Sequence, residues 1–203
     1  MSLKVDNSQR SEDSTATLLA RSLDEHLGTI QTLRDTILGE IERAGKMICT
    51  ALAGSQKILL CGNGGSAADA QHIAAELVGR YEEQRRAWPA IALTTDTSAL
   101  TALSNDYGYE GVFARQVEAL ATSGDILIAL STSGKSANVI KAAEVASKLG
   151  CKTIALTGAR GEPLRSLCDL TIAVPSRRTS RIQEAHITIG HLWCEMVDEI
   201  LRK

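Results

Sequence analysis

The sequence predicts an α/β protein with an open, five-stranded parallel sheet that is flanked by helices on both faces, in a flavodoxin-like, three-layer arrangement. Short apolar runs recur along the chain, and segments of helical periodicity separate them. The runs do not alternate with polar residues, which is typical of parallel strands that are covered on both faces. Only 3% of the residues are aromatic, so the core must consist mainly of aliphatic side chains.

The N-terminal part of the chain is predicted to precede the sheet as helices. Residues 1–15 are polar and without pattern, and we expect them to be disordered. Residues 16–203 are expected to form a single domain. Apolar residues at spacings of three and four predict one amphipathic helix over Leu19–Ile37, and a second helix is predicted over Glu40–Ala53. Residues 16–54 could therefore provide a contact between subunits, or could equally cover their own sheet.

Residues 55–203 are predicted to alternate strands with helices and to form the sheet core. The apolar runs predict strands at Ile58–Cys61, Ala90–Leu93, Asp125–Ser131, Lys152–Leu156 and Leu170–Val174. Helical patterns lie near Ser66–Tyr81, Thr97–Leu103, Val112–Ala121, Ser136–Lys148 and Pro163–Leu167, and a last helix is predicted from Ser180 to Leu201. Ligands of such sheets bind beyond the carboxyl ends of the strands, so the loops that follow the strands are the candidate sites.

Composition narrows the function classes. The net charge of −2 gives no reason to expect nucleic acid or an anionic membrane as a partner. No apolar stretch approaches the roughly 20 residues that span a bilayer, and no signal peptide is recognisable, so we expect a cytoplasmic protein. The five cysteines are odd in number and lack a C-x-x-C spacing, which favours reduced thiols over disulfides or a thiolate zinc site.

The first candidate loop is Gly62-Asn63-Gly64-Gly65-Ser66, between the first strand and a helix. Glycines let backbone N–H groups close on an anionic ligand, and a helix N-terminus adds its positive dipole end. The loop also fits the G-x-G-x-x-A dinucleotide fingerprint, but no acid follows the second strand where that fingerprint requires one. Further along the helix, His72 and Glu76 are four residues apart and therefore share one face.

The second candidate loop is Ser131-Thr132-Ser133-Gly134-Lys135-Ser136, which follows the third strand. It resembles the end of a Walker A motif, but Ala129 stands where the first glycine must be, so an NTPase is not expected. Several hydroxyl groups and backbone N–H groups at a helix start can hold a phosphate monoester without a metal. The simpler alternative is that Ser136 only caps the helix, which needs one hydroxyl where the loop offers four.

The last helix carries three polar side chains of interest: Gln183, His186 and His191. Gln183 and His191 are eight residues apart, so both can face one site, whereas His186 could compete with Gln183 for the same face. A composite site of His72, Glu76, Gln183 and His191 is one interpretation, and isolated surface or core histidines are the alternative.

Taken together, the motifs resemble the sugar isomerase (SIS) superfamily and, within it, the phosphoheptose isomerase family, over about residues 16–200. The resemblance is carried by Cys61–Ser66, Gln71–Tyr81, Asn105-Asp106, Ser131–Ser136 and Arg181–His191. It implies an SIS-type fold and an aldose–ketose isomerase that converts sedoheptulose 7-phosphate to D-glycero-D-manno-heptose 7-phosphate. In that family the reaction is the first step of ADP-heptose synthesis for lipopolysaccharide core or related heptosides.

The resemblance also implies roles for individual residues. The implied substrate contacts are Asn63, Gly64, Gly65, Glu76, Asn105, Asp106, Ser131, Thr132, Ser133, Ser136 and Gln183. The implied ligands of one zinc ion per subunit are His72, Glu76, Gln183 and His191. The implied acid/base pair is Glu76 with His191, and the implied assembly is a homotetramer that binds a phosphorylated heptose.

The alternative function is a non-catalytic SIS-domain scaffold that binds the DnaA replication initiator. That sister group shares much of the chain but lacks the acid at position 76 and the histidine at position 191, and both are present here. Ala67-Ala68 and Ile91–Asp96 look more like the scaffold group, and Ser180 stands where some isomerases carry an acid.

Overall fold

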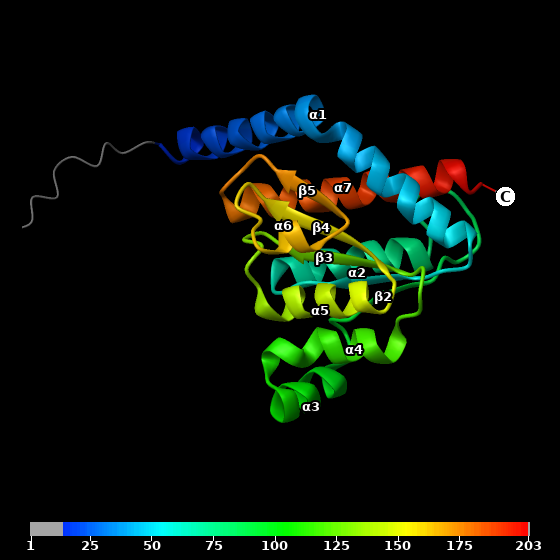
Figure 1. The fold of residues 1–203 in the computed structure, drawn as a ribbon. Coiled ribbons are helices and arrows are strands. Elements are labelled where there is room, and N and C mark those ends of the chain that lie inside the picture. The colour runs from blue at the N-terminus through cyan, green and yellow to red at the C-terminus, as the bar shows by residue number, and fades with distance from the viewer. Residues whose placement is uncertain (1–13, 203) are drawn as a thin grey trace, which may run out of the picture.

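The structure is a computed structural model that describes residues 14–202, and it is built on one parallel sheet (Figure 1). The strands are β1 (Ile58–Cys61), β2 (Ala90–Ala92), β3 (Ile126–Ser131), β4 (Lys152–Gly158) and β5 (Leu170–Val174). Their order in the sheet is β2-β1-β3-β4-β5 and every neighbouring pair is parallel, which confirms the predicted flavodoxin-like architecture. The strand order reverses between β1 and β3, and sheets of this kind bind ligands at that switch point.

Helices cover both faces of the sheet, as predicted. They are α1 (Thr15–Ala53), α2 (Gly65–Val78), α3 (Thr97–Tyr107), α4 (Val112–Leu120), α5 (Ala137–Lys148), α6 (Leu164–Leu167) and α7 (Thr179–Ile200), with a 3-10 turn at Tyr109–Gly111. One buried cluster joins α1, α2 and α7 to side chains such as Ile58 and Leu60, and the other joins α4 and α5 to Leu59 and Cys61. Successive residues of a strand point to opposite faces, so the unalternating run at β1 supplies both cores.

The segment before β1 is one continuous helix, which corrects the prediction of two helices within residues 16–54. Ser14 caps it, and its side-chain oxygen accepts a hydrogen bond from the Thr17 N–H. The predicted disorder of residues 1–15 otherwise lies outside the described residues. Gly39 falls inside α1, and nothing lies within 4 Å of the place where its Cβ would be, so the backbone continues through it without a stop. Figure 1 shows the helix changing direction between its blue first half and its cyan second half.

The second half of α1 packs on the sheet and on α7, while the first half is more exposed. His26 on that first half is joined to Glu184 of α7 by a contact of 2.8 Å between Nδ1 and Oε2. Across residues 14–202, no helix has the length and apolarity needed to cross a membrane. All five cysteines are unpaired, and four of them are buried, as expected for reduced thiols; Cys168 is half-buried.

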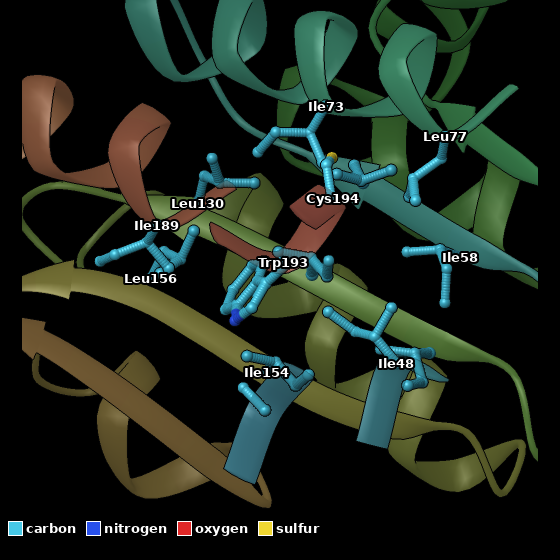
Figure 2. Close-up of a cluster of buried hydrophobic side chains, with 14 of the residues drawn as sticks. Ile48, Ile58, Ile73, Leu77, Leu130, Ile154, Leu156, Ile189, Trp193 and Cys194 are labelled. Atoms are coloured by element: carbon cyan, nitrogen blue, oxygen red, sulfur yellow. The ribbon is translucent and has the colours of Figure 1, made fainter. Parts of the chain in front are cut away.

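Trp193 of α7 lies at the centre of the larger core cluster (Figure 2). Its ring is 1% exposed, and its indole N–H donates to the carbonyl oxygen of Ile41 in α1 at 3.1 Å. Figure 2 shows Ile154, Leu156 and Ile189 around the ring. Because a buried indole without a partner would carry an unsatisfied donor, this bond fixes how α7 lies against α1.

Helices α2 and α7 approach each other closely at one glycine. A Cβ atom added to Gly190 would lie 2.6 Å from Cδ1 of Ile73, so only glycine allows this approach. The contact sets the distance between the two helices that carry the predicted histidines.

Candidate active site

The two predicted loops lie side by side in the fold, because β1 and β3 are neighbours and their carboxyl ends meet at the switch point. The loop after β1 turns at Gly64, whose φ of 55° is a left-handed conformation that favours glycine. Helix α2 begins at the next residue, and the N–H groups of Ser66, Ala67 and Ala68 in its first turn donate to the carbonyl oxygens of Asn63 and Gly64.

Three of the four predicted zinc ligands come together between α2 and α7. His72 Nε2 lies 3.0 Å from His191 Nε2 and 3.4 Å from Glu76 Oε1. At 3.0 Å one imidazole can donate a hydrogen bond to the other, with the roles set by their tautomers. His72 is 48% exposed and Glu76 25%, and both can therefore be reached from solvent. The ring of Tyr81 lies against His191, with 5.7 Å between centroids.

Gln183, the fourth predicted ligand, lies at the other end of α2. Its side-chain amide occupies the space that a Cβ on Gly65 would need. Glycine at this position therefore lets α7 place an amide against the first turn of α2. The predicted competitor His186 does not share this face, because it is fully buried and its Nε2 lies 3.2 Å from the carbonyl oxygen of Thr157.

Burial also determines the charge of the His186 imidazole. Loss of solvent lowers the pKa of its imidazole to about 4, against a smaller opposing effect of the Thr157 carbonyl. His186 is therefore neutral at physiological pH and belongs to the packing of α7 against β4.

The residue types present suit a zinc ion. Imidazole nitrogens and carboxylate oxygens are common zinc ligands, and ligands of tetrahedral zinc lie about 3.4 Å apart for bonds of about 2.0–2.1 Å. Both distances from His72 are near that value. Among residues 14–202, however, no three His, Cys, Asp or Glu side chains are arranged to hold a metal ion as they stand. Both Nε2 atoms offer a lone pair to a metal ion when each imidazole carries its proton on Nδ1.

The loop after β3 presents the predicted hydroxyl groups at the start of α5. Ser136 occupies the N-cap position, but its side chain makes no capping bond. Its Oγ instead lies 3.0 Å from Oγ of Ser131, and Ser133 Oγ accepts from the Lys135 N–H at 3.2 Å. The capping-only alternative is thus wrong for Ser136, which leaves its hydroxyl beside that of Ser131. Thr132, between them, is half-buried.

Asn63 connects the two loops. It exchanges two hydrogen bonds of 2.9 Å with Asn138 in the first turn of α5, and its Oδ1 also accepts from the Tyr109 hydroxyl at 2.9 Å. Asn138 is 3% exposed, and its Oδ1 accepts from the Val139 N–H as well. The sidewall of the site is therefore built from three segments that are far apart in the sequence.

Asn105 and Asp106 lie near the end of α3, and both are exposed. Asn105 Nδ2 donates to Asp106 Oδ1 at 2.9 Å. Within the described part of the chain, neither side chain bonds to the group between α2 and α7. Their predicted role as substrate contacts stays a prediction.

Comparisons with known proteins agree with this geometry. The family model described as "SIS domain" matches residues 23–158. The phosphoheptose isomerase of a Nitratiruptor species is 56% identical over 181 residues, which cover 89% of this chain and 97% of that protein. The phosphoheptose isomerase of Aquifex aeolicus is 59% identical over 155 residues, or 76% of this chain and 81% of that protein.

A solved structure gives the same result at the level of the fold. Phosphoheptose isomerase GmhA from Neisseria gonorrhoeae has a TM-score of 0.87 and 42% identity, and the match covers 92% of this chain and 100% of that one. The chain belongs to the phosphoheptose isomerase family. The resemblance read from the motifs is thereby confirmed, and so is its SIS-type fold.

Two parts of the site in this phosphoheptose isomerase family member were missed by sequence reasoning. Asp69 lies one turn before His72 on α2, and its Oδ2 is buried without a hydrogen-bond partner among the residues that the structure describes. Burial raises the pKa of its carboxyl to about 6, although the charge of His72 acts in the opposite direction. A position three residues before His72 was the available signal, because it lies on the same helix face.

The second missed part is a buried ion pair behind the site. Arg85 Nε lies 2.5 Å from Asp198 Oδ1, and the two side chains are 5% and 6% exposed. Arg85 also donates to the carbonyl oxygens of Glu76 at 2.8 Å and Leu77 at 2.9 Å, near the end of α2. The pair therefore attaches the helix end that carries Glu76 to the helix that carries His191.

Proposed function

We propose that this protein is a phosphoheptose isomerase, an aldose–ketose isomerase that converts sedoheptulose 7-phosphate to D-glycero-D-manno-heptose 7-phosphate, a first step toward ADP-heptose. The observation that carries the proposal is the contact of Glu76, His72 and His191 between α2 and α7, beside a loop rich in hydroxyl groups. Family membership supports it over nearly the whole chain.

The reaction moves a proton between adjacent carbons through an enediol. It requires a base at the carbon and a group that exchanges protons with the two oxygens. Glu76 is the proposed base, since its carboxylate is half-buried and opens to solvent. His191, on the opposite helix, is the proposed acid. His72 contacts both side chains and so holds the pair in position.

The substrate phosphate is proposed to bind the loop after β3. The hydroxyls of Ser131, Thr132, Ser133 and Ser136 and the N–H groups of the first turn of α5 are the donors, and a helix N-terminus favours an anion. The sugar would then extend toward α2. The proposed contacts along it are Asn63, Gly64, Gly65, Glu76, Asn105, Asp106 and Gln183.

One zinc ion per subunit is proposed to be held by His72, Glu76, Gln183 and His191. When bound, zinc would polarise the substrate carbonyl as a Lewis acid. A readout independent of activity is the melting temperature, which zinc should raise for the chelator-treated wild type by preferential binding to the folded state. His72→Ala should abolish that rise, and an equal rise in the variant would contradict the proposed ligand set.

The proposed assembly is a homotetramer in the cytoplasm. Leucines on the first half of α1 support an interface, because they are half or more exposed: Leu18, Leu19, Leu23 and Leu27. A row of large exposed apolar side chains is typical of a surface that another chain covers. The five unpaired thiols suit a reducing compartment. Light scattering at micromolar concentration should give a tetramer, and a stable monomer would contradict the assembly.

The reaction is tested by replacing Glu76. Glu76→Gln keeps the shape and removes the base, so kcat for sedoheptulose 7-phosphate should fall by about 10²–10⁴-fold. Conversion can be followed by NMR, with His191→Asn as a second variant. Glu144→Gln, an exposed acid on α5, is the matched control and should turn over like the wild type. Wild-type protein that binds the substrate with zinc supplied, but never converts it, would refute the isomerase.

The phosphate loop is tested separately by Ser131→Ala with Ser133→Ala. Loss of two donors should raise KM for the phosphorylated sugar strongly while the fold survives. Ser147→Ala, at the exposed end of α5, is the control. An unchanged KM in the double variant would contradict phosphate binding at this loop.

The DnaA-binding scaffold is not favoured. The relatives reported above are isomerases, and Glu76 and His191, which the scaffold group lacks, both line the site between α2 and α7.

A further inference from the structure

A second hollow lies on the other side of the loop after β3, toward β4 and β5. Its volume is about 220 Å³, and its walls come from the loops that follow β3, β4 and β5 and from Thr179 and Ile182 of α7. The lining includes three cationic side chains, Lys135, Arg160 and Arg177, and no carboxylate. It excludes the group between α2 and α7, so it is separate from the proposed acid/base pair.

The walls of this hollow are tied together by the backbone. Gly158 N–H donates to the carbonyl oxygen of Thr132 at 3.0 Å, and Ala159 N–H donates to that of Ser176 at 3.0 Å. These bonds join the loop after β4 to the loops on either side of it. The hollow is therefore formed before any ligand arrives, which lowers the ordering cost of binding.

The three cations of the hollow have no carboxylate partner among the described residues. Within residues 14–202, no ion pair involves the side chain of Lys135, Arg160 or Arg177, whereas the adjacent Arg178 is paired with Glu25. Hydroxyl groups of Thr132, Ser133 and Ser176 lie on the same walls. The hollow is thus lined by cations and hydroxyl donors and by no acid, although the chain as a whole has a net charge of −2.

We infer that this hollow is a second anion-binding subsite, which takes a small polyanion of the phosphate or diphosphate class. Guanidinium groups bind phosphate oxygens through paired, charge-assisted hydrogen bonds, and the hydroxyls supply neutral donors beside them. The volume is below the roughly 300–1,000 Å³ of sites for drug-sized ligands, which favours a small anion over a nucleotide. Thr132 and Ser133 line this hollow and also belong to the proposed phosphate loop, so the two anions would be bound next to each other.

The test uses inorganic pyrophosphate as the probe, titrated by calorimetry into the full-length protein at fixed ionic strength. Arg160→Ala with Arg177→Ala should weaken pyrophosphate binding by about tenfold or more, since charge-assisted bonds to the anion are lost. The same variant should keep KM for sedoheptulose 7-phosphate within about twofold of the wild type, because neither residue lies in the proposed substrate site. The matched control is Arg43→Ala with Lys148→Ala, which removes the same charge from exposed helix positions outside the hollow.

Three results would overturn the inference. Pyrophosphate that binds the double variant as tightly as the wild type would show that the hollow is not its site. An equal loss of pyrophosphate affinity in the control variant would show that the effect comes from the overall charge of the protein. A parallel rise in KM would assign the hollow to the substrate phosphate itself. If the wild type proves to have no isomerase activity, the calorimetric comparison still decides the subsite.

Discussion

Replacing Arg85 with Ala should lower the free energy of unfolding by about 3–5 kcal/mol, because it leaves Asp198 buried without its counter-charge. The two side chains are 5% and 6% exposed, so the small values of exposed ion pairs do not apply. Asp198 Oδ2 also accepts from the N–H groups of Glu82 and Glu83 at 3.2 Å each, and these bonds remain in the variant. The carbonyl oxygens of Glu76 and Leu77 each lose a bond from Arg85 as well, although Leu77 keeps the bond from the Trp88 N–H at 3.0 Å.

The variant Asp198→Asn removes the charge of this side chain and keeps its shape. The amide fills the same space but leaves Arg85 buried without its counter-charge, so this variant should also lose about 3–5 kcal/mol. Burial raises the pKa of Asp198, but the hydrogen bonds from Arg85 and from the Glu83 and Glu82 N–H groups outweigh it, and the net pKa is lowered. A lowered pKa gives stability above the unfolded value of about 3.9, which is lost as the pH falls through the folded value. Asp198→Asn should therefore lose less stability than the wild type when the pH is brought below about 4.

Urea unfolding at pH 7 and at about pH 3, below the unfolded pKa, measures both effects, with m-values compared to exclude a change in the unfolded state. Arg202→Ala is the control, because its ion pair with Glu83 is 59% and 57% exposed and should contribute less than about 1 kcal/mol. A loss below about 1 kcal/mol for Arg85→Ala would refute the reasoning, as would stabilities of the two single variants that simply add in the double variant.

Three further outcomes are expected. Asp69→Asn should stabilise the protein above pH 6. Because the folded pKa of Asp69 is about 6, the wild type loses stability as the pH rises from about 4 to 6, by at most about 3 kcal/mol. Melting curves across that range should show this loss in the wild type and a flat profile in the variant. Gly190→Ala should destabilise by about 1–3 kcal/mol, since the new methyl meets Ile73 at 2.6 Å, and equal urea midpoints would contradict the close approach of α2 and α7. Asn138→Ala removes the two hydrogen bonds that position Asn63, so it should raise KM for the sugar phosphate and cost about 1–3 kcal/mol of stability. An unchanged KM would contradict a role of Asn63 in substrate binding.

The elements that were predicted correctly from the sequence are those that depend on a local pattern of residues. The predicted strand at Ile58–Cys61 has the bounds that the structure gives it, because a short apolar run between a lysine and a glycine is typical of a buried strand. His72 and Glu76 could be placed on one face from their spacing alone. The error at α1 has a local cause too: Gly39 resembles a helix stop, but a glycine with open space around it costs only about 1 kcal/mol within a long helix.

The remaining features depend on pairings between distant segments. Arg85 and Asp198 are 113 residues apart, and Asn63 and Asn138 are 75 apart. A charge or an amide in a loop gives no sign of its partner, because these bonds exist only after α2, α5 and α7 have been placed by the sheet. Asp69 is different, since its position on α2 was readable, but its raised pKa follows from burial that the helix period alone does not specify.

The close approach of α2 and α7 at Gly190 has a consequence for how long the site survives. His72 and His191 are carried by helices that share a core contact and are joined at the end of α2 through Arg85, which is paired with Asp198 of α7. Separation of the two helices, as distinct from rotation of the exposed imidazoles, would then need the same rare opening that exposes Trp193. Slow hydrogen exchange should report one common rate for the middle of both helices, and heat inactivation should follow the unfolding rate constant, not an earlier local event.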